Sequence, residues 1–213
     1  MKRSWTLLGM VLLLALPAYA GGPSVTEDKG NIVLVEAGGK KRKLTSTGQD
    51  SQPNLAPDGK AVVFVRRGSG KVESASGEVE ANELWWIDTA GGKPRRLVSS
   101  AANDDPKKFL GELQAPQFSP DGKTVFFMSA AWATSGAIHK VDVATGKVQF
   151  VAPGNSLEVI SRGEYRGRLI AQQHKYFLGA GTYDWFWVLE PDGREVGPIG
   201  EDVSNFRDMY LSE

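Results

Sequence analysis

Only two imidazole side chains, His139 and His174, are available in the sequence as a general base. A hydrolytic site of the serine type needs a nucleophile, a base within hydrogen-bonding reach and an orienting acid. His139 lies in the apolar stretch 137–143 and His174 in the polar run 172–175, and no Gly-x-Ser-x-Gly turn occurs to present a serine. We therefore predict no catalytic residue, interpret both histidines as ordinary surface or strand-end residues, and do not expect the chain to be an enzyme.

The sequence does not indicate a metal or cofactor site any more strongly than it indicates a hydrolytic site. Two distant histidines in a chain without cysteine do not form a zinc site. The acidic residues do not follow the spacing of a calcium-binding loop. Asp58, Asp121 and Asp192 each follow a proline and precede a glycine, as turn residues do. We expect neither a metal nor a cofactor.

The tryptophan side chains are more informative. Trp85 and Trp86 are adjacent, so in a strand they point to opposite faces, and Trp187 lies in a similar apolar strand. Such rings either fill the spaces between packed sheets or, where one stays exposed, stack on a sugar or pack against a protein partner. Trp132 lies among the small residues of segment 130–136, which give it little packing reason to be there. The candidate binding residues are Trp132, Trp85 and Trp187.

An internal repeat marks the elements that would position these side chains. Segments 53–60 and 116–123 have nearly the same sequence, and each runs into an apolar segment, 61–65 or 124–128. Proline fixes φ at the first corner of a tight turn, aspartate hydrogen-bonds the backbone ahead of it, and glycine accepts a positive φ. Each segment is therefore predicted to be the turn of a β-hairpin. The structural turn residues are Pro57, Asp58, Gly59, Pro120, Asp121 and Gly122.

A second type of turn recurs between these corners. Four segments each consist of an apolar strand, a glycine turn and a more polar strand, and the turns are roughly fifty residues apart, as in propeller blades. A third corner is expected within 160–171, where Pro-Asp-Gly is absent but 165–167 can still turn the chain. The four turn glycines are Gly39, Gly92, Gly146 and Gly193.

Together these motifs resemble a known repeat family. The order Pro-x-x-(Ser/Ala)-Pro-Asp-Gly-Lys, apolar strand, Leu-Trp-x-Ile-Asp-x-x-Gly-Gly and a strand ending in Leu-Val is similar to the TolB-type β-propeller repeat, a Pro-Asp relative of the WD-type blade. The resemblance covers 50–98 and 114–152 well and 155–200 loosely. It implies an all-β propeller, as in periplasmic TolB and in the propellers attached to prolyl-oligopeptidase-like hydrolases.

The number of blades follows from what the repeat leaves unassigned. The hairpin at 31–45 has no preceding pair of strands, and 202–211 is the only segment left at the other end. We expect about four blades, the fourth being shared between the amino-terminal and carboxyl-terminal segments, since closure removes exposed strand edges. The alternative is an open arc of blades, completed in one version by a second copy of the chain. Insertions at 66–77 and 99–114 fall at the rims, where binding residues commonly lie.

The amino terminus has the pattern of an export signal. Lys2 and Arg3 precede a short apolar run at 7–16, and 18–20 supplies small residues at the cleavage spacing. The apolar run is too short to span a membrane, and the chain has no cysteine for a lipid anchor or a disulfide. We expect a periplasmic or secreted protein that does not span the membrane after cleavage. The predicted domains are a signal peptide at 1–20 and a single propeller-like domain at 21–213.

Charge narrows the range of partners. The sequence has 25 basic and 25 acidic residues, and its densest basic cluster, 40–43, lies in a hairpin turn, so no nucleic-acid interface is expected. The leading hypothesis is an exported non-catalytic binding module whose partner is a protein of the cell envelope. One alternative is binding of a cell-wall glycan such as peptidoglycan by exposed tryptophans. Another is a hydrolase or lyase whose site lies in the central channel.

Overall fold

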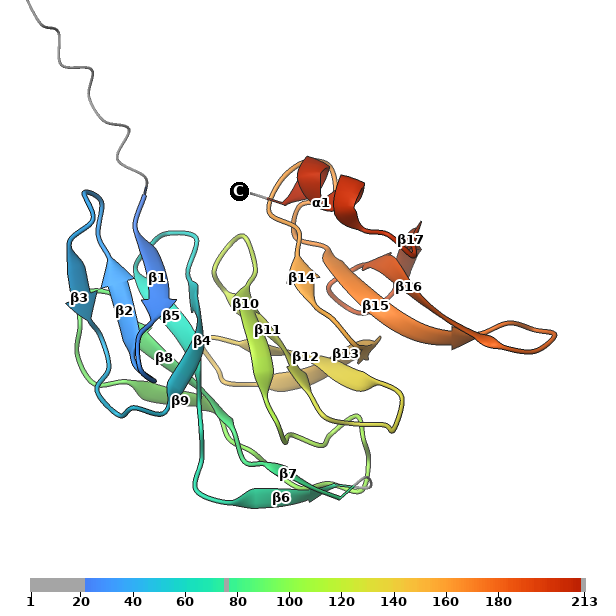
Figure 1. The fold of residues 1–213 in the computed structure, drawn as a ribbon, viewed down its shortest axis with the longest axis horizontal. Coiled ribbons are helices and arrows are strands. Elements are labelled where there is room, and N and C mark those ends of the chain that lie inside the picture. Colours follow the sequence, from blue (N-terminus) through green and yellow to red (C-terminus); the bar gives the residue numbers. More distant parts are fainter. Residues whose placement is uncertain (1–21, 75–76, 212–213) are drawn as a thin grey trace, which may run out of the picture.

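The chain folds into four antiparallel sheets of three or four strands and one two-stranded sheet, in a computed structural model that describes residues 22–74 and 77–211 (Figure 1). The four larger sheets form the blades, which are called blades 1 to 4 in chain order. Blade 1 contains β1 (Ser24–Glu27), β2 (Ile32–Val35) and β3 (Lys41–Lys43). Blade 2 contains β4 (Asp50–Leu55), β5 (Ala61–Arg66), β8 (Glu83–Asp88) and β9 (Arg95–Val98). Blade 3 contains β10 (Gln114–Phe118), β11 (Thr124–Ser129), β12 (Gly136–Asp142) and β13 (Val148–Gly154). Blade 4 contains β14 (Glu158–Val159), β15 (Leu169–Tyr176), β16 (Thr182–Leu189) and β17 (Glu195–Gly200).

Two further elements lie outside the blades. The hairpin of β6 (Lys71–Ser74) and β7 (Gly77–Glu80) is inserted between β5 and β8, and α1 (Ser204–Tyr210) follows β17. The first strands of the blades, β1, β4, β10 and β14, lie next to one another along the inside of the arc. No helix in residues 22–74 and 77–211 is long and apolar enough to cross a membrane. The predicted signal peptide at 1–20 lies outside the described residues.

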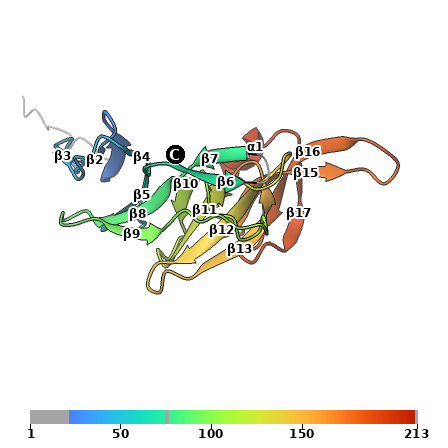
Figure 2. The ribbon, with the colours of Figure 1, turned by 90° about the horizontal axis from the view of Figure 1, so that it is seen from below.

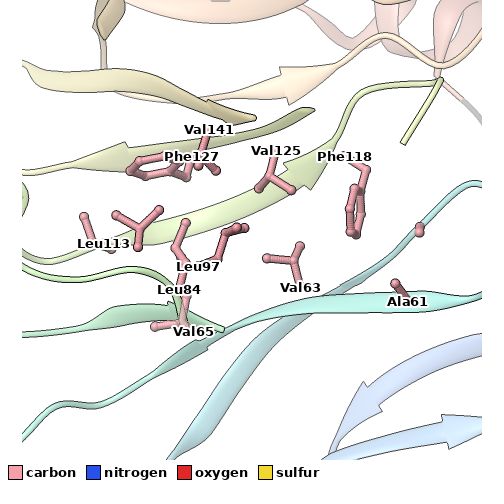
Figure 3. Close-up of a cluster of buried hydrophobic side chains, with 12 residues drawn as sticks. Ala61, Val63, Val65, Leu84, Leu97, Leu113, Phe118, Val125, Phe127 and Val141 are labelled. Atoms are coloured by element: carbon pink, nitrogen blue, oxygen red, sulfur yellow. The ribbon is translucent and has the colours of Figure 1, made fainter. Parts of the chain in front are cut away.

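The central strands are apolar on both faces because each blade is covered on both sides. In β5, Val62 and Phe64 pack toward blade 1, whereas Val63 and Val65 pack toward blade 3. A strand buried on both faces has a continuous run of apolar residues instead of strict alternation. Figure 3 shows the cluster between blades 2 and 3, where Val63 and Leu84 face residues of blade 3 such as Phe127.

Side-chain amides join the inner strands of neighbouring blades. Gln117 on β10 donates from Nε2 to the carbonyl oxygen of Leu157 (2.7 Å), and its Oε1 accepts from the amide of Val159 (2.9 Å). Asn54 on β4 likewise accepts from the amide of Phe118 (3.0 Å). These bonds satisfy backbone groups that have no strand partner between blades. They fix the separation of adjacent blades at the inner edge.

The ends of the chain do not share a blade. No strand pairing joins blade 1 and blade 4 within the described residues, so the all-β propeller prediction is confirmed in its open-arc form. The shared fourth blade was wrong for two reasons. Blade 1 has its own inner strand, β1, which has only Val25 as an apolar signal. The segment 202–211 forms α1, because Val203, Phe206 and Tyr210 recur at helical spacing and pack on Ile160 of blade 4.

The insertion at 66–77 is more ordered than its composition predicts. It continues into the β6–β7 hairpin, in which Val72 is paired with Val79 and the remaining residues of the two strands are polar or glycine. Two apolar residues give almost no periodic signal. What holds the hairpin is its contact with the second insertion, at 99–114.

Candidate functional site

The β6–β7 hairpin lies on the side of the arc opposite the Pro-Asp-Gly corners (Figure 1), and its residues line a groove there. It consists of two adjoining pockets of about 310 and 250 Å³ that share Ser74 and Ala131 on their walls. We call it the hairpin groove. Its walls come from the hairpin, from the insertion at 99–114 and from the loop between β11 and β12, so the two insertions predicted at the rims meet here.

The hairpin is fixed against the second insertion by a close approach at Gly111. A β-carbon at this position would lie 2.5 Å from Cγ2 of Val72, so only glycine allows the two segments to pack. The amide of Glu112 also donates to the carbonyl oxygen of Glu80 (2.8 Å), at the end of β7. The hairpin is thereby attached at its base and along one strand.

Trp132 forms one wall of the groove. Its half-buried ring meets Phe150 edge to face at 6.2 Å, and its amide closes a turn onto the carbonyl oxygen of Ser135 (2.8 Å). Asn155 supports this loop, since its Nδ2 donates to the carbonyl oxygen of Thr134 (3.0 Å) and its Oδ1 accepts from an amide at the start of β12. The sequence-based candidate Trp132 therefore has a defined position beside a cavity.

A buried Ser129–His139 pair lies at the floor of the groove. Oγ of Ser129 is 2.9 Å from Nε2 of His139, and it is also within hydrogen-bonding distance of the carbonyl oxygens of Phe109 (3.1 Å) and Ala130 (3.0 Å). The hydroxyl has one proton, which either a carbonyl oxygen or an unprotonated Nε2 can accept. Nδ1 has no acceptor within the described residues, and a buried N–H without an acceptor is costly, so we assign the proton of the neutral ring to Nε2, which then donates to Oγ. In this tautomer the imidazole does not act as a base toward Ser129.

Burial keeps this imidazole neutral. His139 is 1% exposed, its ring stacks on Phe127 at 5.4 Å, and desolvation lowers its pKa from 6.5 to about 4. Nδ1 has no hydrogen-bond partner within the described residues, as expected for the unprotonated nitrogen of the Nε2–H tautomer. The pair therefore links blade 3 to the 99–114 insertion.

The groove is acidic. Glu73, Asp104 and Glu112 line it, and neither lysine nor arginine does so within the described residues. Three lysines lie close to it along the chain: Lys71 pairs with Glu78 at 3.5 Å, Lys108 pairs with Asp105 at 3.3 Å, and Nζ of Lys107 lies 5.6 Å from the ring centre of Phe150. Three unpaired carboxylates beside an aromatic ring make a negative potential that attracts an ammonium or guanidinium group.

A larger pocket, of about 490 Å³, lies between blades 2 and 3 at the Pro-Asp-Gly corners. Its charges are mixed, with Lys60 and Arg166 beside Asp58, Asp88 and Asp121. One guanidinium nitrogen of Arg166 also donates to the carbonyl oxygen of Pro120 (3.3 Å). Because charges of both signs line this pocket and it contains none of the candidate tryptophans, we do not treat it as the site.

The other sequence-based candidates lie away from the groove. Trp85 packs between blades 1 and 2, with the guanidinium of Arg66 4.3 Å from its ring centre and its Nε1 donating to Glu83 (3.0 Å). Trp187 packs between blades 3 and 4, and Nζ of Lys175 lies 3.4 Å from its ring centre. Both rings occupy spaces between sheets, and neither shares a pocket with Trp132.

The second histidine forms an exposed pair. Nδ1 of His174 is 2.8 Å from Oδ1 of Asp184 across the β15–β16 hairpin, far along the chain from any serine of the groove. Within the described residues, no group of three His, Asp or Glu side chains is placed to hold a metal ion.

The acidic lining of the hairpin groove was missed by the sequence analysis. The alternation of glutamates at 73, 78 and 80 around two valines was its only signal.

Comparison with known proteins identifies solved structures that have a similar fold. No family model and no curated protein sequence matches the chain. Among solved structures, the tricorn protease is similar with a TM-score of 0.56 and 14% identity, over 85% of this chain and 18% of that one. An oligogalacturonate lyase in complex with manganese gives 0.52 and 16%, over 78% and 40%. Dipeptidyl peptidase 4 of Porphyromonas gingivalis gives 0.50 and 10%, over 84% and 31%.

One further similar structure belongs to the family that the sequence motifs resemble. TolB of Acinetobacter baumannii is also among the similar structures, with a TM-score of 0.38 and 13% identity over 88% of this chain and 55% of TolB. The four blade-like sheets, together with the matches that have a TM-score of 0.50 or more, give the chain the fold of β-propeller proteins. A TolB-type repeat in particular stays a prediction. The chain spans less than two thirds of the length of each of these proteins.

The comparison corrects the functional hypothesis. The sequence led us to expect a non-catalytic binding module of the cell envelope, because of the export signal, the repeat, the missing catalytic groups and the aromatic residues expected at the rim. Among the solved structures described above, those with a TM-score of 0.50 or more are two peptidases and a lyase. The fold therefore does not indicate a non-catalytic envelope protein, and that hypothesis was wrong.

Proposed function

We propose that this chain is the substrate-recognition propeller of a peptide-processing enzyme and binds a basic peptide in the hairpin groove. The observation that carries the proposal is the combination of Trp132 with three unpaired carboxylates in a groove that no lysine or arginine of the described residues lines. An ammonium or guanidinium side chain gains both from the carboxylates and from the face of the indole. Two adjoining pockets suit an extended strand better than a single compact ligand.

The fold gives this proposal a context. Two of the similar structures are peptidases, and their names are the reason for considering a peptide. The lyase is named for oligogalacturonate, a polyanion, and the carboxylates Glu73, Asp104 and Glu112 would repel such a ligand. Ser129 is not assigned as a nucleophile, because His139 does not act as its base in the Nε2–H tautomer.

A binding experiment tests the proposal. Fluorescence polarisation would compare a labelled lysine- and arginine-containing peptide with an acidic peptide of equal length. We expect the basic peptide to bind more tightly, and its affinity to fall as salt rises from about 0.1 M to about 1 M, where the Debye length shortens from about 10 to about 3 Å. Equal binding of the two peptides would contradict the proposal.

Matched variants assign the effect to the groove. Trp132→Ala should weaken binding about tenfold, as loss of an aromatic anchor does, and Glu112→Gln should weaken it about threefold, as loss of one exposed charge pair does. Glu201→Gln, an exposed carboxylate outside the groove, is the control and should change nothing. If all three variants bind as the unchanged protein does, the peptide is not held in this groove.

We also infer that the protein is exported. The support is the pattern at 1–20, with its basic start, apolar run and small residues before Gly21. Mass spectrometry of the protein recovered outside the cytoplasmic membrane should find Gly21 as the first residue. Recovery of the intact chain from the cytoplasm would contradict the inference.

A further inference from the structure

The β15–β16 hairpin extends beyond blade 4 into solvent, as two perpendicular views show (Figures 1 and 2). Its end is apolar. Tyr176 is 70% exposed, Phe177 is 53% exposed and Leu178 is fully exposed. We call residues 176–183 the hairpin tip. Single exposed apolar residues are common on protein surfaces, but three in sequence at the end of a projecting element need an explanation.

The tip is held in a defined shape by its own contacts. The amide of Phe177 donates to the carbonyl oxygen of Gly181 (3.1 Å), and the ring of Phe177 packs on Tyr183 at 4.7 Å. Tyr183 packs in turn on Trp185 at 4.9 Å. The exposed side chain of Leu178 is therefore presented on an ordered hairpin and has not simply failed to find a core.

Polarity changes in a fixed order along the hairpin. The tip contains no charged residue, and its aromatic residues flank Leu178 on both strands. The first charged groups follow directly behind it, as the His174–Asp184 pair and the ion pair of Lys175 with Glu195. Along the hairpin, apolar residues at the end are followed by amphipathic tyrosines and then by charged residues. The layers of a lipid bilayer change in the same order, from hydrocarbon through the interface to water.

We propose that the hairpin tip inserts into the interface of a lipid bilayer and attaches the propeller to a membrane surface. The tip is convex and narrow, whereas a stable protein partner usually covers about 800 Å² on each side. A sugar would need hydrogen-bonding groups, and the most exposed side chain, Leu178, has none. A fluid lipid surface requires neither a flat patch nor polar complementarity. This attachment is independent of peptide binding in the hairpin groove.

Vesicle flotation tests the proposal. Vesicles of phosphatidylethanolamine and phosphatidylglycerol would be mixed with the protein purified after expression of the full chain, its first residue being determined by mass spectrometry. We expect the protein to float with the vesicles and Leu178→Asp to reduce the bound fraction about tenfold, since the variant loses the burial of one leucine. Met209→Ser, which removes another exposed apolar residue at 58% exposure, is the control and should bind as before.

A second measurement reports the position of the tip. Lipids brominated near the headgroup should quench tryptophan fluorescence, and Trp185→Phe should remove most of that quenching because Trp185 adjoins the tip. Failure of the unchanged protein to float, equal losses in Leu178→Asp and Met209→Ser, or quenching that persists in Trp185→Phe would each overturn the proposal. So would a change from dimer to monomer in Leu178→Asp without any change in vesicle binding, since the tip would then contact a second copy of the chain.

Discussion

Acidification should destabilise this fold through one buried side chain, His139. Its pKa is lowered from 6.5 to about 4, so between these values the unfolded chain binds a proton that the folded chain does not. Stability then rises with pH across this window, is complete above about pH 6.5 and is lost as the pH falls toward 4. At about 1.4 kcal/mol per pKa unit, the difference amounts to about 3 kcal/mol of unfolding free energy.

The assay is urea unfolding followed by circular dichroism between pH 7 and pH 4, for the unchanged protein and for His139→Gln. Glutamine can still donate to Ser129 but does not titrate, and loss of the ring should cost about 1 to 2 kcal/mol at pH 7. The two stability curves should therefore converge and cross at about pH 5. Titrating carboxylates affect both proteins equally, so the difference between the curves isolates the imidazole.

His174→Gln, which removes the other imidazole, assigns the effect to the correct histidine. The reasoning fails if the unchanged protein and His139→Gln keep the same difference in stability from pH 7 to pH 4. That result would mean that the ring accepts a proton in the folded state, for which the orphaned Nδ1 would need a partner.

Three further predictions concern packing and polar contacts. Gln117→Leu should lower the free energy of unfolding in urea by about 2 to 3 kcal/mol, since it leaves a buried carbonyl and a buried amide between blades 3 and 4 without partners. A decrease of less than about 0.5 kcal/mol would show that water replaces the side-chain amide of Gln117. Gly111→Ala should displace Val72, lower the melting temperature and weaken peptide binding together, whereas a loss of stability alone would separate the hairpin from the site. Asp50→Asn should cost about 3 kcal/mol, because the fully buried carboxylate accepts two bonds from Arg66, and adding Arg66→Met should recover part of that loss.

The blades could be predicted from the sequence because their signals are local. A turn with proline, aspartate and glycine next to a strand apolar on both faces specifies one hairpin without reference to distant residues. The ends were harder. β1 has a single apolar residue, Val25, and its pairing with β2 is visible only in three dimensions. In α1, Phe206 and Tyr210 have helical spacing, but this spacing predicts a helix only once it is known that blade 4 presents an apolar face to them.

The candidate site could be predicted only in part. Trp132 was recognisable, since a large ring among small residues is a local anomaly. The carboxylates Glu73 and Glu112 come from two insertions that meet in space through Val72 and Gly111, a contact between residues far apart in the sequence. The role of Ser129 was equally hidden, because its hydroxyl is directed by carbonyl oxygens of two different loops.

The position of the groove follows from how an open arc distributes its core. The cluster between blades 2 and 3 contains twelve buried residues, whereas the clusters at the two ends, around Ile32 and around Ile160, contain four each. Local opening should therefore begin at blade 1 or at α1 and reach the centre last. The walls of the hairpin groove come from blade 3 and from the two insertions at 66–77 and 99–114, so fluctuations at blade 1 or at α1 would leave them in place. A site that binds by charge and aromatic contact needs such preorganised walls, because ordering them on binding would reduce affinity.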